Sequence, residues 1–445
     1  MKEAHPLEQA IGMELYSTVS PGIGGRLKDR FEDFVVQEIT TDQTTLQIEE
    51  WPTTPVTQSV EGERSRFLTF TVQKMGLATM DVATILASSL KISRNYVTYA
   101  GLKDKRAVTV QTMSAPAKAA ETLSSLELSR IAIRDIRYTR QPIQIGDLWG
   151  NRFSISLKDI TEDSDTALEA VENLRDTPLL NYFGVQRFGL TRPYTHLVGK
   201  ALVKRDYEEA VRIMLTTTSE YESEELTHIR NKLSEELIPT EKIIDSFPME
   251  LNYEKDVMKH LMKRPNEFEK AMLKIPPKVL TLQVHAYQSY IFNRLISERA
   301  RRGMSIHRPQ VGDFLIKLDE AHSGRDSWLF VTDSSLEERE KQVDSEEFGL
   351  AAPVPGYATR LPPSQQTDLL KQILMDEDVR LHEFRNSSMK SLDAPGGLHL
   401  TSIVLKDLEA STIDEGLSVQ FSLRKGSYAT VVMREIMKNH PINRV

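Results

Sequence analysis

The chain has 445 residues, of which 40% are hydrophobic and 27% are charged, and it contains no cysteine. This composition is typical of a globular protein, and the length is sufficient for two or more domains. The lack of cysteine excludes disulfides and cysteine-based zinc sites. The N-terminus lacks the apolar run of a signal peptide, and no apolar run approaches membrane-spanning length. We therefore expect a cytoplasmic protein with no membrane partner.

The charge of the chain is unevenly distributed. The formal net charge is -8, but residues 206–256 alone carry -9 and residues 333–347 carry -5, which leaves +6 on the rest. Residues 91–106 contain five basic residues and one acidic residue. Because phosphate binding requires a local basic surface rather than a basic total, the distribution is compatible with a nucleic-acid partner.

The first notable stretch is glycine-rich and covers residues 22–38. Its glycines could indicate a phosphate-binding loop, but no strand precedes them and no dinucleotide-type helix follows, so we reject this interpretation. Lys28 lies at the end of the glycine-rich part and is either an ordinary exposed lysine or a functional base. Phe34 is expected to pack in the core.

Residues 68–72 alternate between apolar and polar side chains and predict a half-buried strand that ends in a turn at 74–76. Thr79 is the expected N-cap of a helix whose apolar face contains Val82, Leu86 and Leu90.

Two further strands are predicted over 96–99 and 108–112, and Gly101 provides a bend between them. The turn places Asp104 between Lys103 and the pair Lys105 and Arg106. Neighbouring cations favour an ionised carboxylate, which can act as a nucleophile or a base when it is held in position. The alternative is a surface turn residue in a solvated charge cluster.

The remaining elements follow from periodicity. We expect strands over 153–157 and 419–423, helices over 163–176, 280–302 and 368–374, several acidic helices over 190–275, and an irregular stretch over 306–360. Gly303 is the expected C-terminal cap of the long helix. Arg299, Arg301 and Arg302 at the end of that helix are considered as contacts to a nucleic-acid backbone. Tyr182, Phe183 and Phe188 are expected to pack rather than to stack on bases, and Arg187 could reach a phosphate.

Six separated blocks resemble the TruD family of tRNA pseudouridine synthases: residues 28–38, 100–111, 150–153, 181–189, 286–293 and 426–435. The resemblance implies an α+β fold. A pseudouridine synthase catalytic core, with a mixed, largely antiparallel sheet and flanking helices, would span residues 1–180 and 391–445. An inserted α+β TRUD domain would span residues 181–390.

The resemblance also implies an activity, which is isomerisation of uridine-13 in the D-arm of tRNA to pseudouridine. Asp104 would be the nucleophile and Lys28 its basic partner, while Asn151 and Phe153 would form the uridine pocket. Lys103, Lys105 and Arg106 are included among the substrate-binding residues. No metal and no other cofactor is expected, and a monomer is favoured.

Two positions depart from the family pattern. Phe31 stands where the family usually has proline, and the turn at 395–397 is followed by Leu398, His399 and Leu400 where related chains tend to have an arginine.

Two other functions stay open. One is a non-catalytic RNA-binding protein with the same fold, and the other is a hydrolase with paired carboxylates, for which Glu38 is the candidate second acid.

Overall fold

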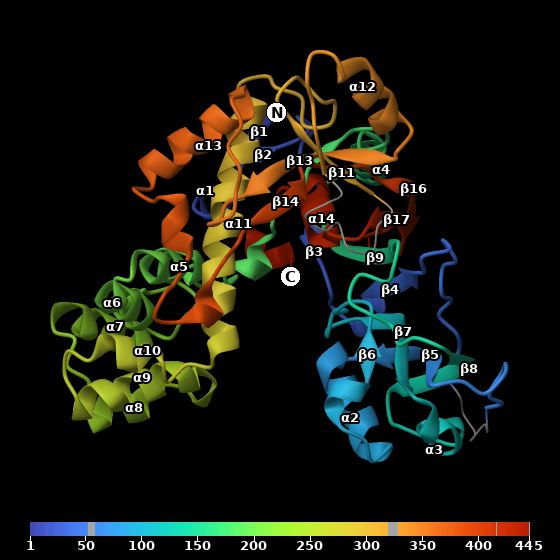
Figure 1. Ribbon diagram of the computed structural model, residues 1–445, viewed down its shortest axis with the longest axis horizontal. Helices are drawn as coiled ribbons and strands as arrows, with labels where there is room; N and C mark the ends of the chain where they lie inside the picture. Colours follow the sequence, from blue (N-terminus) through green and yellow to red (C-terminus); the bar gives the residue numbers. More distant parts are fainter. Residues whose placement is uncertain (52–57, 319–327, 415, 445) are drawn as a thin grey trace.

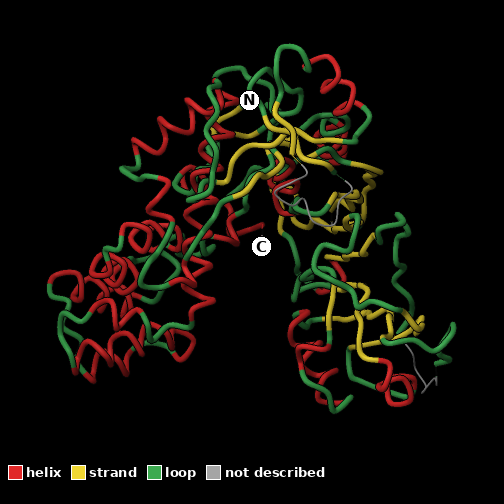
Figure 2. Tube along the Cα trace, in the orientation of Figure 1, coloured by secondary structure: helices red, strands yellow, loops and turns green. Residues whose placement is uncertain are grey.

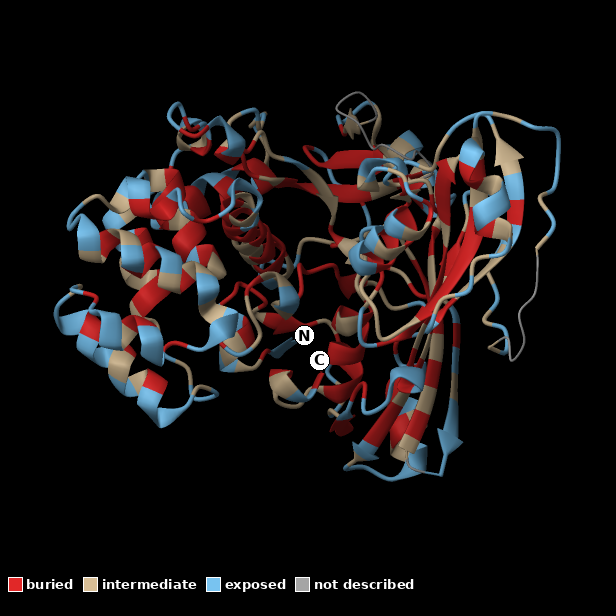
Figure 3. Ribbon diagram, turned by 90° about the horizontal axis from the view of Figure 1, so that it is seen from below, coloured by how far each residue is buried: buried red, intermediate tan, exposed pale blue. Residues whose placement is uncertain are grey.

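The computed structural model describes residues 1–51, 58–318, 328–414 and 416–444. Figure 1 shows an arch with two arms, one built mainly of helices and the other mainly of strands. Figure 2 shows the same division by secondary structure. Buried residues follow the strands of the sheet and the inner faces of the helices, while the exposed residues lie on the outer faces (Figure 3).

The main sheet has nine strands. Their order is β16 (Lys406–Ile413), β17 (Gly416–Arg424), β9 (Gly150–Ile160), β4 (Phe34–Ile39), β7 (Val108–Pro116), β5 (Phe67–Met75) and β8 (Ile131–Thr139), with β3 (Gly24–Arg26) beside β9 and β6 (Thr98–Tyr99) beside β7. Within the described residues, β4 and β7 are the parallel pair of this sheet and the other pairings are antiparallel. The prediction of a mixed, largely antiparallel sheet in an α+β chain is confirmed.

The C-terminal part of the chain completes this sheet. The strand predicted over 419–423 is confirmed as β17, which pairs with β9 so that Phe421 lies opposite Phe153. Apolar side chains at alternate positions of both strands face the same core. α14 (Ala429–Met437) follows, and its buried residues belong to that core.

α2 (Thr79–Ser89) covers the other half of the sheet, where Val82 and Leu86 pack against Leu68 and Phe70 of β5. The predicted N-cap is wrong by one residue, because Ala78 is the cap and Thr79 begins the helix. The hydroxyl of Thr79 instead accepts a hydrogen bond from the main-chain N of Lys103. The strand predicted over 96–99 is shorter than expected, because residues Arg94–Tyr96 form a 3-10 turn before β6.

The helical arm confirms the prediction of several helices over 190–275. They are α5 (Thr195–Lys204), α6 (Tyr207–Thr216), α7 (Glu224–Glu235), α8 (Glu241–Ser246), α9 (Asn252–Lys263) and α10 (Phe268–Met272). The long helix is α11 (Pro277–Arg301), which is followed by Gly303 at a positive φ of 70°. The smaller helices α4 (Ser164–Glu172) and α13 (Gln365–Asp376) also lie where the periodicity placed them.

The prediction of an irregular stretch over 306–360 is wrong. This region contains β11 (Phe314–Lys317), β12 (Trp328–Phe330), α12 (Leu336–Asp344) and β13 (Phe348–Val354), and β14 (Gly397–Leu400) completes a four-stranded sheet. The seven-residue β13 is apolar throughout and shows no alternation, and strands of three or four residues, such as β11 and β12, give too little alternation to be recognised in the sequence. They are stabilised by cross-strand aromatic contacts, in which Phe314 lies 5.5 Å from Trp328 and 5.4 Å from Phe330 between ring centroids.

The chain leaves the region of the nine-stranded sheet and returns to it at one place. β10 (Leu179–Leu180) pairs with β15 (Ser402–Ile403), so the two crossing points lie side by side. The limits of an inserted domain at residues 181 and 390 stay a prediction.

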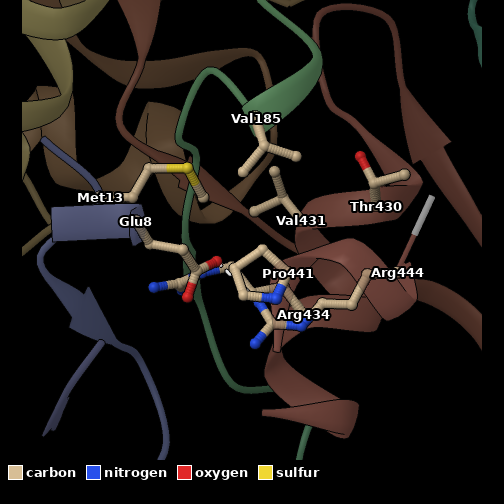
Figure 4. A pocket seen from close by; sticks show the side chains of 9 residues that line it. Glu8, Met13, Val185, Thr430, Val431, Arg434, Pro441 and Arg444 are labelled. Carbon is tan, nitrogen blue, oxygen red and sulfur yellow. Dashed lines mark hydrogen bonds and ion pairs between the residues drawn. The ribbon is translucent and has the colours of Figure 1, made fainter. Parts of the chain in front are cut away.

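The two ends of the chain are joined by buried ion pairs. α1 (Pro6–Gln9) carries Glu8, whose Oε1 lies 2.7 Å from Nε of Arg434 and 2.7 Å from Nη1 of Arg444. Figure 4 shows these side chains around a small cavity between α1 and α14. Burial raises the pKa of Glu8, but the two guanidinium groups outweigh burial and lower the pKa overall. We assign this cluster a structural role, because its charges are paired with one another.

The remaining short elements are β1 (Lys2–Glu3), β2 (Leu15–Tyr16) and α3 (Ala120–Ser124).

Candidate active site

Asp104 and Lys28 meet because their loops precede the two central parallel strands. Val35 of β4 lies opposite Val108 of β7, so the residues before each strand emerge at the same edge of the sheet. There Nζ of Lys28 lies 2.8 Å from Oδ1 of Asp104. The Lys28 side chain is 5% exposed and the Asp104 side chain is 34% exposed. The aspartate is therefore bound by a buried ammonium group on one side and is accessible to solvent on the other.

Lys28 adopts an uncommon backbone conformation, with a positive φ of 60°. Its ammonium group also lies 4.2 Å from the centroid of the Phe34 ring. An aromatic face and a carboxylate both favour a cation at this place. Phe34 is buried, as the sequence predicts, and it also forms one wall of the lysine site.

A second ion pair is fully enclosed beside the first. Nζ of Lys103 lies 2.7 Å from Oε2 of Glu38, and both side chains are nearly without exposed surface. The same ammonium donates to Oδ1 of Asn151 at 2.7 Å, and the main-chain N of Thr112 donates to Oε1 of Glu38 at 2.9 Å. Lys103 therefore fixes Glu38 and Asn151, and its charge is already neutralised within the protein.

This pair bears on the hydrolase alternative. A general base that activates water must be reachable by water, whereas Glu38 is 1% exposed and paired with Lys103. The geometry does not favour Glu38 as the second acid of a glycosidase.

Phe153 lies on β9 and is 5% exposed. Its ring lies 6.2 Å from the ring of Phe34 and 5.6 Å from the ring of Phe421, between centroids. The strand pattern predicts this core environment. A bound base could contact Phe153 only at the edge of its ring, because the rest of the ring is buried.

Lys105 and Arg106 are exposed. Within the described residues, neither side chain makes a hydrogen bond or ion pair to another residue. They line an open groove together with residues 29–32 and Gly76. Their position directly after Asp104 suits contact with phosphates.

Two residues that support the turn at 103–106, Lys74 of β5 and Thr79 of α2, are not identified in this role by the sequence analysis. Lys74 has no exposed surface, and its Nζ donates to the main-chain oxygens of Asp104 and Leu77, each at 2.8 Å. Thr79 accepts a hydrogen bond from the main-chain N of Lys103 at 2.9 Å and donates to Gln111 at 3.0 Å. These contacts fix both ends of the Lys103 to Asp104 segment.

A signal for Lys74 does exist in the sequence. It follows Phe70 and Val72 at alternate positions of one strand, and both of those residues are buried. A lysine in register with a buried face is unusual unless it has internal partners. Burial lowers the pKa of Lys74 to about 8, although the nearby Asp104 acts in the opposite direction.

The interpretation of Arg299 as a nucleic-acid contact is wrong. Its side chain is fully buried, and its guanidinium makes a bidentate pair with Asp313 at 2.6 and 2.7 Å. Arg301 pairs with Glu3 and Glu14, and Arg302 pairs with Glu298. A one-dimensional pattern does not show which arginines at a helix end point inward.

His399 does not replace the arginine that related chains tend to have. It stacks on Phe183 with ring centroids 4.4 Å apart, and its Nε2 lies 3.2 Å from Nδ2 of Asn181. Burial and the neighbouring Arg187 lower the pKa of His399 to about 3, so the ring is neutral near pH 7. Tyr182 and Phe188 are fully buried, and Phe183 is nearly so, which confirms packing for all three.

Among the residues that the structure describes, no group of three or more histidines and acidic residues is placed to hold a metal ion. Within the same ranges, no helix has both the length and the apolar character needed to cross a membrane.

The architecture is that of the pseudouridine synthase class. A crystal structure assigned to tRNA pseudouridine synthase D (TruD) from Methanosarcina mazei superposes with a TM-score of 0.81 at 28% identity, covering 99% of this chain and 100% of that one. The family model described as "tRNA pseudouridine synthase D (TruD)" matches residues 10–436. The chain therefore belongs to the TruD family.

Curated relatives support the same assignment over the full length. A protein of Methanococcoides burtonii is 30% identical and one of Methanosarcina acetivorans is 31% identical, each aligned over 99% of this chain and at least 98% of the relative. A third, from Methanopyrus kandleri, is 34% identical over 84% of this chain and 86% of its own length. All three carry the name "Probable tRNA pseudouridine synthase D".

Proposed function

We propose that this protein converts uridine-13 in the D-arm of tRNA to pseudouridine, with Asp104 as the nucleophile. The observation that carries the proposal is the 2.8 Å contact between Lys28 and Asp104. The buried ammonium group of Lys28 holds the carboxylate in position, and the partial exposure of the aspartate leaves it accessible to a nucleoside. Membership in the TruD family supports the reaction class.

The reaction is an isomerisation, so no atom enters or leaves. The glycosidic bond between N1 of uracil and C1′ of the ribose breaks, the base rotates, and C5 of uracil forms a bond to the same C1′. The proton on C5 is lost and N1 gains a proton. Asp104 can serve by attacking the sugar, by attacking the base, or by deprotonating the sugar, and all three roles require the same anionic carboxylate beside the ribose.

The other residues of the site have proposed supporting roles. Asn151 is held by Lys103 and would present its amide group to the polar edge of uracil. Phe153 would contact the base with the edge of its ring, and base contacts on aromatic side chains contribute roughly 1–3 kcal/mol. Lys105 and Arg106 would hold phosphates, since both are exposed and without ion pairs among the described residues.

Uridine must leave its stack before Asp104 can reach it, which costs a few kcal/mol. We propose that residues 181–390 form an inserted TRUD domain that grips the folded tRNA by its shape and its phosphates and so offsets this cost. The residues proposed for the site all come from one chain, and we propose that the protein acts as a monomer.

The direct test is to incubate the protein with unmodified tRNA transcript and to map pseudouridine at each position. We expect pseudouridine at position 13, and none with Asp104→Asn, while the affinity for tRNA stays within about threefold because one acidic charge near phosphates is removed. A non-catalytic RNA-binding protein would bind tRNA and leave its uridines unchanged. A hydrolase would release free uracil instead. Modification at another position would refute the assignment to uridine-13 alone.

A further inference from the structure

An exposed aromatic side chain lies close to the candidate active pair. Phe31 is 36% exposed and begins the 3-10 turn Phe31–Asp33. Its ring lies against Gly76, where an added Cβ would be only 3.0 Å from Cζ of Phe31. The turn is held by the main-chain N of Arg30, which donates to Asp33 at 2.6 Å. The turn that carries the ring is therefore fixed, one side of the ring is covered at Gly76, and the ring stays partly open to solvent.

The groove around Phe31 is built from the same loops that carry Lys28 and Asp104. One wall is formed by residues 29–32, directly after Lys28, and the other by Lys105 and Arg106, directly after Asp104. Because the two loops are joined by the contact between Lys28 and Asp104, a ligand in this groove lies next to the reacting nucleoside.

The charge of the groove suits an anion. Arg30, Lys105 and Arg106 make no ion pair within the described residues, whereas one of the two acids of the groove, Asp29, lies 3.4 Å from Arg26. Unpaired cations around an exposed aromatic ring match the two parts of a nucleotide, since the ring can stack on a base and the cations can hold its phosphates.

We propose that this groove is a binding subsite for a nucleotide that neighbours the target uridine in the substrate RNA. The neighbouring base stacks on Phe31, and its phosphates are held by Lys105 and Arg106. This inference rests on the proposed function, because it takes the target uridine to be bound at Asp104. A stacked neighbour also compensates in part for the stacking that the target base loses when it is extruded.

The test compares Phe31→Ala with Phe31→Trp and with a matched control. Tyr96 is the control because it is also an exposed aromatic residue of the catalytic sheet region, and β6, which follows it, pairs with Ser114 and Met113 near the far end of β7 from Asp104. With tRNA transcript as substrate, we expect Phe31→Ala to lower kcat/KM about 5- to 50-fold, mostly through KM, while Phe31→Trp and Tyr96→Ala stay within about twofold of the wild type. Thermal midpoints of all variants verify folding.

A modified substrate isolates the stacking contact. Transcripts lacking the base directly 5′ or directly 3′ of the target uridine are made, and each is assayed with the wild type and with Phe31→Ala. We expect one of the two abasic transcripts to abolish the difference between the two proteins, because the stacking partner is already gone. A difference that persists equally on both transcripts overturns the subsite, as does a Phe31→Ala variant that behaves like Tyr96→Ala.

A measurement of RNA binding tests the phosphate contacts independently of the proposed function. Replacing Lys105 and Arg106 by alanine in the same chain should reduce the slope of log Kd against log salt by about 2, since each lost phosphate contact removes about 1. An unchanged slope overturns the phosphate part of the subsite. If the wild type leaves tRNA unmodified, the proposed function fails. The subsite is then decided by RNA affinity alone, which Phe31→Ala must weaken about 5- to 50-fold and Tyr96→Ala must leave unchanged.

Discussion

Nζ of Lys74 lies 2.8 Å from the main-chain oxygen of Asp104, beneath the loop that carries the proposed nucleophile. The groups that face Lys74 are Asp104, Lys103 and Asp81, and burial is the largest influence on its pKa. A lysine with no exposed surface and a lowered pKa has a charge that depends on pH within the working range of many enzymes.

We predict a stability gain in alkaline solution that depends on Lys74. Its pKa is about 8 in the folded protein and 10.5 in the unfolded chain, so between these values the unfolded chain binds more protons and the free energy of unfolding rises with pH. Relative to Lys74→Met, the wild type should gain about 3 kcal/mol between pH 8 and 10.5. Urea unfolding of both proteins across this range measures the difference, and parallel curves would contradict the prediction.

The Lys28 side chain is expected to be required for turnover rather than for RNA binding. Lys28→Met removes the cation that faces Asp104 and should lower kcat about 10²-fold, while tRNA affinity changes by less than about threefold. Lys91→Met is a matched control, since Lys91 is exposed and also has a positive φ, of 52°. Equal losses in the two variants would indicate backbone strain rather than a role of the ammonium group.

The buried pair of Lys103 and Glu38 should be strongly coupled. Lys103→Met leaves the carboxylate of Glu38 buried without its ion partner and should cost about 3–5 kcal/mol of stability. The double variant Lys103→Met with Glu38→Gln should recover part of this loss. Glu49→Gln removes the exposed carboxylate of a pair with Arg134 and should cost less than about 1 kcal/mol. If the loss of stability in the double variant equals the sum of the losses in Lys103→Met and Glu38→Gln, the two residues are not coupled.

Phe153 should contribute both to the core and to the site. Phe153→Ala is expected to cost about 3–5 kcal/mol, because the ring packs between Phe34 and Phe421. Phe153→Leu keeps most of the volume and allows activity to be measured on folded protein. We expect kcat/KM to fall about 5- to 50-fold in Phe153→Leu and to stay near the wild-type value in Phe421→Leu. Similar activities for the two leucine variants would assign Phe153 to the core alone.

Acid should destabilise the helical arm through His196. Burial lowers the pKa of His196 to about 4, so the unfolded chain takes up its proton below about 6.5 while the folded protein does not. Stability is therefore fully present above pH 6.5 and falls by up to about 3 kcal/mol as the pH drops to 4. His196→Leu should remove this part of the acid loss, and replacement of the exposed His228 by leucine should not. Thermal unfolding between pH 4 and 7 distinguishes the two variants.

Much of the fold could be predicted because its long elements have clear periodicity. The strand that includes Phe153 is an example, since it buries alternate residues along one face. Strands β11 and β12 could not be recognised, because three or four residues do not establish a period and their stability depends on neighbours distant in the sequence. Strand β13 has seven residues but is apolar throughout, so it shows no alternation.

The sequence by itself determined the family blocks, the helix and strand periods and the position of Asp104 in a basic turn. Only the tertiary structure decided which charges face inward. It brings Lys28 to an aspartate 76 residues away, buries Lys74 and Arg299 against internal partners, and leaves Lys105 exposed. The physical reason is that a charge is tolerated in the interior only when partners from other elements surround it, and those partners are set by the packing of the sheet rather than by neighbours in the chain.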